Sequence, residues 1–158
     1  MNEIPVSHAT FVIERLYPTA VEHVFNAFAD PAIKRQWFAE GEGFEVDSFE
    51  MDFRVGGFER ARFRFSAGQP IAHGTTCGND TVYLDIIPNQ RIVLAYTMTI
   101  AGNRISSSLA TTELYPASSG TSLKFTEQAA FFEGADGPTI REQGQRKLFE
   151  KLAQHLTQ

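Results

Sequence analysis

The chain has 158 residues, with 14 lysines and arginines against 19 aspartates and glutamates, and a formal net charge of −5 at neutral pH. Its length suits one domain over residues 1–158, and 42% hydrophobic residues suffice for a globular core. The acidic balance argues against a nucleic-acid-binding protein, which usually presents a basic surface.

The first predicted element is a strand in "ATFVIERLY", with Phe11 and Ile13 on one face. A helix is expected next, in "TAVEHVFNAFADP". Thr19 and Glu22 have the spacing of a capping box, in which each side chain accepts a free backbone N–H. The apolar stripe of this helix consists of Val21, Val24, Phe25 and Phe28.

The pair Asp30-Pro31 predicts the end of this helix and the start of a short second one. Asp can cap the new helix, and Pro fits its first turn because that N–H has no helical partner. Ile33 and Trp37 would share one face of the short helix.

From Phe44 to Phe131 the pattern changes to six strands separated by short turns, which predicts antiparallel hairpins. Apolar and polar residues alternate clearly in "FERARFRF", where an apolar face is opposed by a stripe of arginines. The apolar parity slips near Asp47-Ser48, which predicts a β-bulge. The faces are Ala61, Phe63 and Phe65 against Arg60, Arg62 and Arg64 in this strand, and Ile92, Leu94, Tyr96 and Met98 in a later one.

A long helix closes the chain, with Pro138 suited to its first position. Its apolar stripe is expected at Ile140, Gly144, Leu148, Leu152 and Leu156, with Phe149 alongside. Arg141, Arg146 and Lys151 are expected to face water.

The paired glycines in "DFRVGGFERARF" have two possible roles. A phosphate-binding loop places its glycines before a helix, with Lys-Ser or Lys-Thr following. Here Gly56-Gly57 precede a strand pattern, so we expect a tight hairpin turn that needs positive φ.

Several phrases, in this order and spacing, resemble the activator-of-heat-shock-ATPase homologue family of the START-related SRPBCC superfamily. They are "FVIERLYPTAVEHVFNAFADP", "WF", "DFRVGG", "VYLDIIPNQRIVLAYTM" and "SGTSLKFTEQ". The resemblance implies an α+β helix-grip fold, with a curved antiparallel sheet wrapped around a long C-terminal helix and two short helices after the first strand. It also implies an apolar cavity between the sheet and that helix.

The remaining reactive side chains give weaker signals. The histidines have no partners at metal-ligand spacing, so no metal or cofactor is expected. Cys77 lacks the surroundings of a nucleophile and is interpreted as a small structural residue. With one cysteine no disulfide can form within the chain, which favours a reducing, cytoplasmic compartment. No signal peptide or membrane span is expected.

The stripe of Arg60, Arg62 and Arg64 could meet an anionic partner, but a solvated outer face is favoured.

Glu127 shares the apolar face of its strand with Leu123 and Phe125, so it is either a buried pocket carboxylate or a strand-end residue that reaches water. Large side chains could converge under the final helix, and periodicity alone does not separate a filled core from a cavity. The resemblance favours a cavity, in which Tyr83, Tyr96 and Glu127 would orient a ligand. The expected ligand-binding residues are Trp37, Phe49, Met51, Phe63, Phe65, Tyr83, Tyr96, Met98, Glu127 and Phe149.

The favoured function is therefore binding of a small hydrophobic or amphipathic molecule, without a cofactor. One alternative is a co-chaperone that stimulates a heat-shock ATPase, ranked lower because the usual co-chaperone carries an additional N-terminal domain. Another is a cyclase- or hydrolase-type enzyme that uses Glu127 and a tyrosine, although no catalytic residue is assigned. A homodimer is left open.

Overall fold

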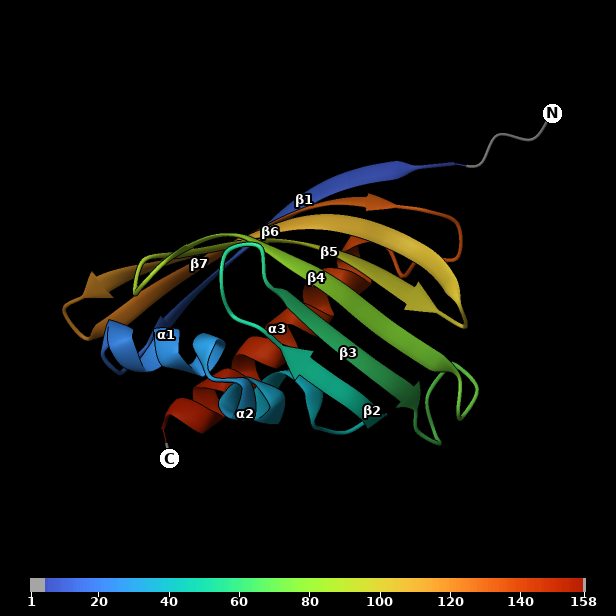
Figure 1. Ribbon diagram of the computed structural model, residues 1–158, viewed down its shortest axis with the longest axis horizontal. Helices are drawn as coiled ribbons and strands as arrows, with labels where there is room; N and C mark the ends of the chain where they lie inside the picture. Colours follow the sequence, from blue (N-terminus) through green and yellow to red (C-terminus); the bar gives the residue numbers. More distant parts are fainter. Residues whose placement is uncertain (1–4, 158) are drawn as a thin grey trace.

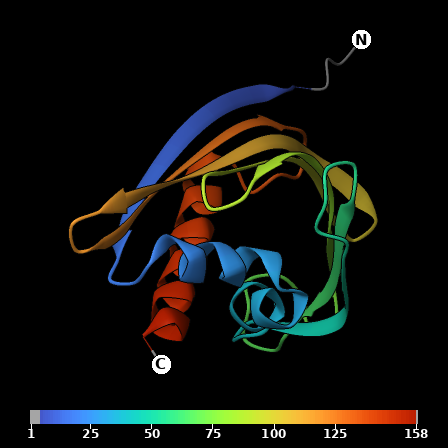
Figure 2. The same ribbon diagram turned by 60° about the vertical axis from the view of Figure 1, so that its left-hand side comes forward.

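The computed structural model describes residues 5–157 and shows a curved seven-stranded antiparallel sheet wrapped around the C-terminal helix α3 (Figures 1 and 2). The strand order is β1-β7-β6-β5-β4-β3-β2. This is the predicted helix-grip architecture. The strands are β1 Ser7–Tyr17, β2 Phe44–Met51, β3 Phe58–Phe65, β4 Thr76–Ile87, β5 Arg91–Ile100, β6 Asn103–Ala117 and β7 Gly120–Phe131. The helices are α1 Val21–Ala29, α2 Pro31–Lys34, the π-helical turn η1 Arg35–Ala39, and α3 Pro138–Leu156.

The alternation in β3 positions its side chains as predicted. Ala61, Phe63 and Phe65 are buried on the concave face, which looks toward α3, whereas the arginines between them are exposed on the outer face. Arg62 pairs with Asp80 and Arg64 with Asp47, so this stripe is a solvated face with its own counter-charges. The predicted bulge is confirmed by a register shift between Val46 and Ser48.

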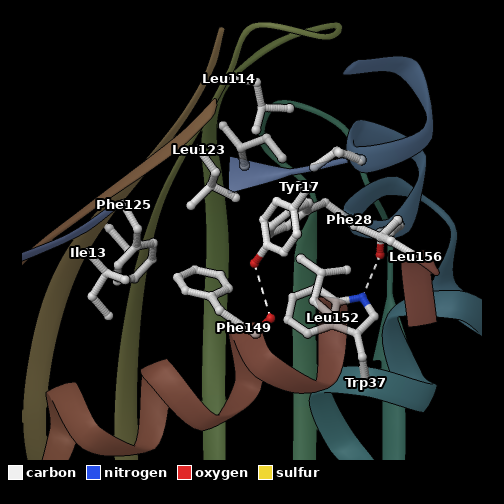
Figure 3. Packing of buried hydrophobic residues seen from close by; sticks show 14 of the residues in the cluster. Ile13, Tyr17, Phe28, Trp37, Leu114, Leu123, Phe125, Phe149, Leu152 and Leu156 are labelled. Carbon is white, nitrogen blue, oxygen red and sulfur yellow. Dashed lines mark hydrogen bonds between the residues drawn. The ribbon is translucent and has the colours of Figure 1, made fainter. Parts of the chain in front are cut away.

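A packed core fills the space between α1, α3 and the β1–β7–β6 part of the sheet (Figure 3). Each large apolar side chain buried there stabilises the fold by about 1.5–3 kcal/mol. Two hydrogen bonds cross this core. The Trp37 indole N–H donates to the Ala27 carbonyl (2.8 Å), and the Tyr17 hydroxyl donates to the Phe149 carbonyl (3.1 Å). These bonds connect η1 to α1 and β1 to α3.

The predicted capping box of α1 is wrong. The N-cap is Ala20, which has no side-chain cap, because the helix begins one position later than the box requires. Thr19 Oγ1 instead lies 2.8 Å from Nδ1 of His23. The cap of α2 is confirmed, since Asp30 accepts hydrogen bonds from the backbone N–H groups of Ala32 and Ile33.

The predicted face of α3 is also wrong in its first half. Ile140 is 60% exposed and Gly144 is exposed, whereas Arg141, expected in water, is only 6% exposed. The buried face continues from Arg141 to Phe149 and then along the last two turns of the helix. An arginine can occupy this face because buried carboxylates and hydroxyls receive its N–H groups.

Gly56 and Gly57 lie in the connection between β2 and β3, as the turn prediction requires. Gly56 has a φ of 81°, while Gly57 does not have positive φ. A Cβ at Gly57 would overlap the backbone carbonyl oxygen of Asp52, so Gly57 is needed for close approach instead. The turn is also bonded to β4, since Gly56 N–H donates to the Tyr83 carbonyl (2.8 Å) and Tyr83 N–H donates to the Gly57 carbonyl (3.1 Å). No helix follows the glycines, so the phosphate-loop alternative is rejected.

These two glycines should respond differently to alanine. Gly56→Ala meets no atom within 4 Å and only forces a left-handed backbone, so it should lower the free energy of unfolding by about 1–2 kcal/mol. Gly57→Ala should lower it by more, because the Asp52 backbone must move. Chemical denaturation measures both values, and equal losses would contradict the close-approach explanation.

Candidate functional site

The middle of the concave face carries a row of polar side chains from adjacent strands. Antiparallel pairing sets Tyr96 of β5 opposite Ser108 of β6, and sets Glu127 of β7 opposite Ala110, two residues further along β6. The Tyr96 hydroxyl donates to Glu127 Oε2 (2.8 Å), and the Ser108 hydroxyl donates to the same oxygen (2.9 Å). Glu127 is 1% exposed, so it is buried and does not reach water as the strand-end interpretation required.

Arg141 of helix α3, which lies across from the concave face, contacts this row of polar side chains. Its Nη1 lies 3.0 Å from the Tyr96 hydroxyl and 3.4 Å from Glu127 Oε2. Its Nε and Nη2 both donate to the Asp136 carboxylate at 2.8 Å, and Nη2 also donates to Ser106 Oγ (2.9 Å). These contacts fasten the beginning of α3 to three strands of the sheet.

Burial dominates the electrostatics of this network. It raises the pKa of Glu127, although the donors Tyr96, Arg141 and Ser108 act in the opposite direction. Glu127 Oε1 is buried and has no hydrogen-bond partner in the described part of the chain, which adds to the penalty for ionisation. Burial, reinforced by the Glu127 charge, also raises the pKa of Tyr96, so its phenol stays protonated.

A second buried pair lies on the same face, nearer to β2. Lys34 of α2 contacts Glu59 Oε1 of β3 at 2.5 Å, and the Tyr83 hydroxyl of β4 donates to that oxygen at 2.7 Å. Lys34 and Glu59 are 5% and 3% exposed. Burial raises the pKa of Tyr83, and the adjoining Glu59 carboxylate adds to the shift. This pair fastens α2 to the sheet.

Two chemical roles suit the main network. A carboxyl group with a raised pKa is protonated more readily than an ordinary one, so it can donate a proton as well as accept one. Tyr96 suits a different role, because a phenol whose pKa is raised is a hydrogen-bond donor and not a base. Burial raises the pKa of Cys77 to about 11, so this thiol is not a ready nucleophile.

The structure divides the expected ligand-binding residues into two groups. Trp37, Tyr83 and Phe149 are packed in the core, with Trp37 and Phe149 drawn in Figure 3, and Phe63, Phe65 and Glu127 are also buried. The half-buried members are Phe49, Met51, Tyr96 and Met98. Tyr96 and Glu127 are brought together, as their shared inward parity predicts.

Sequence reasoning missed Arg141, Ser108, Lys34 and Glu59. Arg141 could have been found, because it lies eight residues before Phe149 and therefore on the same helical face. Ser108 occupies a buried, inward position of β6, between the exposed Ser107 and Leu109. Within residues 5–157, no group of three or more His, Cys, Asp or Glu side chains could hold a metal ion, and no helix is long and apolar enough to cross a membrane.

The fold and this network define a helix-grip protein with a buried polar row on the concave face of its sheet. The model of the family described as activator of Hsp90 ATPase homolog 1-like protein matches residues 18–157, and the chain belongs to this family.

Several solved structures are similar to the chain. The protein Mll3558 from Rhizobium loti is 47% identical, with a TM-score of 0.82, 94% of this chain and 97% of that chain being covered. A protein from Rhizobium leguminosarum is 35% identical, with a TM-score of 0.90 and 99% of each chain covered. An AHSA1-like protein from Aeromonas hydrophila, with 14% identity and a TM-score of 0.67 over 94% of this chain and 92% of that chain, shares the fold. None of the curated proteins compared with the chain matches it.

Removing Arg141 should expose the dependence of Glu127 on its partner. Arg141→Met should lower the free energy of unfolding by about 3–5 kcal/mol, because carboxylates remain buried without their cation. The loss should be smaller in a Glu127→Gln background, as a double-mutant cycle in denaturant would show. Arg146→Met removes an exposed ion pair of the same helix and should change stability by less than about 0.5 kcal/mol. Equal Arg141→Met losses in both backgrounds would contradict the coupling.

The raised pKa of Glu127 should also appear in the pH dependence of stability. Because the folded state holds this proton more tightly than the unfolded chain does, its contribution is fully present below the ordinary value of 4.5 and is lost as pH rises through the folded value. Relative to Glu127→Gln, the wild type should therefore lose stability as pH rises above 4.5. Unfolding free energies over a pH series measure this difference, with Glu14→Gln, which alters an exposed carboxylate, as the control. A wild type that gains on the variant with rising pH would contradict it.

Proposed function

We propose that the protein binds a small hydrophobic or amphipathic molecule between the concave face of its sheet and helix α3. One observation carries the proposal: several large side chains point toward this face by strand parity and yet remain only half-buried. A residue that faces the interior but keeps accessible surface borders space that its neighbours do not fill. These side chains are Phe49 and Met51 of β2, and Leu94, Tyr96 and Met98 of β5.

The chemistry around this space supports an amphipathic ligand. Its walls are apolar or aromatic, and the network of Tyr96, Ser108, Glu127 and Arg141 supplies polar groups at one place. Ligand pockets usually combine these two elements, with apolar walls that bind and a few polar groups that orient. Membership of the family and the helix-grip fold are consistent with such a pocket.

A partner protein is the second candidate, and it has a specific observation in its favour. The outer face of the sheet exposes Val82, Leu84 and Leu109, which are 49%, 48% and 37% accessible. The family description names an activator of the Hsp90 ATPase, so an ATPase chaperone is the partner to test. Stimulation of ATP hydrolysis by purified Hsp90, lost in Val82→Asp, would favour this candidate.

A neutral fluorescent dye, N-phenyl-1-naphthylamine, tests the ligand-binding proposal. It should bind the folded protein saturably at one site, with an emission increase that disappears on unfolding. Leu94→Trp places a larger ring on the concave face and should weaken binding by at least about tenfold, which corresponds to 1.4 kcal/mol. Leu109→Trp makes the same change on the outer face of the neighbouring strand and should leave the affinity unchanged.

The two tryptophan variants also show whether the dye binds on the outer face of the sheet instead. Open hollows lie on the outer face, one of them lined by Thr10, Ala95, Leu109 and Gln128. If Leu109→Trp weakens the dye and Leu94→Trp does not, binding occurs on the outer face and the proposal fails. Absence of saturable binding would also overturn it. Far-UV circular dichroism of both variants confirms that each is folded.

A further inference from the structure

The donors and acceptors around the buried carboxylates are unequally satisfied. A guanidinium has five N–H donors and no acceptor, and a hydroxyl has one donor. The N–H groups of Arg141 are directed at Asp136, Ser106, Tyr96 and Glu127. The hydroxyl hydrogens of Tyr96 and Ser108 are both directed at Glu127 Oε2. The main donors of this network are therefore already engaged.

Among the residues that the structure describes, two fully buried acceptor atoms of the concave face lack a hydrogen-bond partner. Glu127 Oε1 and Asn79 Oδ1 are the buried side-chain nitrogen or oxygen atoms without a hydrogen-bond partner within residues 5–157. Asn79 lies on β4 opposite Ala61 and Met98, so it shares the concave face with Glu127. In the second pair, Lys34 and Tyr83 each direct a donor at one oxygen of Glu59, Oε1. A buried acceptor is stabilised by a ligand that brings a donor.

The charges of the two buried clusters also disfavour an anionic ligand. The two clusters contain the cations Lys34 and Arg141 and three carboxylates, those of Glu59, Glu127 and Asp136. Each cation is paired, so they have no net positive charge whether Glu127 is ionised or protonated. The Arg141 guanidinium is also covered by the Phe131 ring, with its Cζ 5.2 Å from the ring centroid. A ligand carboxylate brought here would lose its hydration and find no free cation.

On the basis of the proposed function, we infer that the ligand is an uncharged apolar molecule carrying a hydroxyl donor, and that the network discriminates against carboxylate and sulfonate amphiphiles. A hydroxyl group can donate to a carboxylate oxygen and can also accept from a protonated carboxyl, so it suits Glu127 in either state. An ionised fatty acid has acceptors alone. Specificity thus comes partly from repulsion of the wrong ligand.

Two dyes that differ by one group provide the first test. N-phenyl-1-naphthylamine is neutral, and 1-anilinonaphthalene-8-sulfonate is the same molecule with a sulfonate added. At pH 8 the neutral dye should bind the wild type at least about tenfold more tightly, since one buried unpaired charge easily exceeds 1.4 kcal/mol. Equal or tighter binding of the sulfonate would overturn the inference while leaving the proposed function intact. Failure of both dyes to bind would overturn both.

Displacement of the neutral dye by three compounds with an eight-carbon chain tests the hydroxyl donor. 1-Octanol should displace it at a concentration at least about tenfold lower than octanoate, and also lower than methyl octyl ether, which lacks the donor. Glu127→Gln should reduce the preference for octanol over octanoate, because the amide is uncharged and adds a donor. Glu14→Gln, on the exposed outer face of β1, should retain it. An ether as effective as the alcohol, or an octanoate as effective, would contradict the inference even if Glu127→Gln does not fold.

Discussion

The contact between Arg141 and Glu127 joins helix α3 to the sheet. The guanidinium comes from the first turn of α3 and the carboxylate from the centre of β7, and both are almost fully buried. Such a pair is no guarantee of stability, since desolvation opposes the attraction between its charges. It does fix position, because Glu127 without Arg141 would be a buried carboxyl group without a cation, and Arg141 without Glu127 would keep only Asp136, among the described residues, as its ion-pair partner. The orientation of α3 over the concave face follows from this constraint.

The arrangement of the interior follows from where this pair lies. Toward the C-terminal end of α3, Phe149, Leu152 and Leu156 pack against the sheet and α1, and the core is closed (Figure 3). Toward its N-terminal end, the buried face of the helix carries Arg141 and not an apolar side chain. The half-buried Tyr96 and Met98 of β5 contact this arginine. The same helix therefore stabilises the fold with one half and presents polar groups with the other. The ligand site that we propose lies beside this polar half.

The sequence predicted the strands and the overall architecture well, because period-two alternation, turn residues and the family resemblance all agreed. The bulge after Val46 was predicted from parity alone, whereas parity placed Glu127 on the inner face but left its burial open. The helix details were less accessible. The predicted N-cap of α1 was wrong by one residue. The buried face of α3 was assigned wrongly, because Arg141 was expected in water on account of its charge. Its acceptors come from β5, β6 and β7, and no local pattern reveals contacts so distant in sequence. The extent of unfilled space depends on packing, which periodicity does not report.

The central claim is that ligand binding occurs on the concave face, beside the buried network. Methyl-resolved NMR during a titration with N-phenyl-1-naphthylamine tests it directly. The methyl signals of Met51, Leu94 and Met98, which point to the concave face, should shift saturably with the dye concentration. Those of Val82, Leu84 and Leu109, on the outer face of the same sheet, should stay in place. Shifts confined to the outer-face methyls would contradict the account.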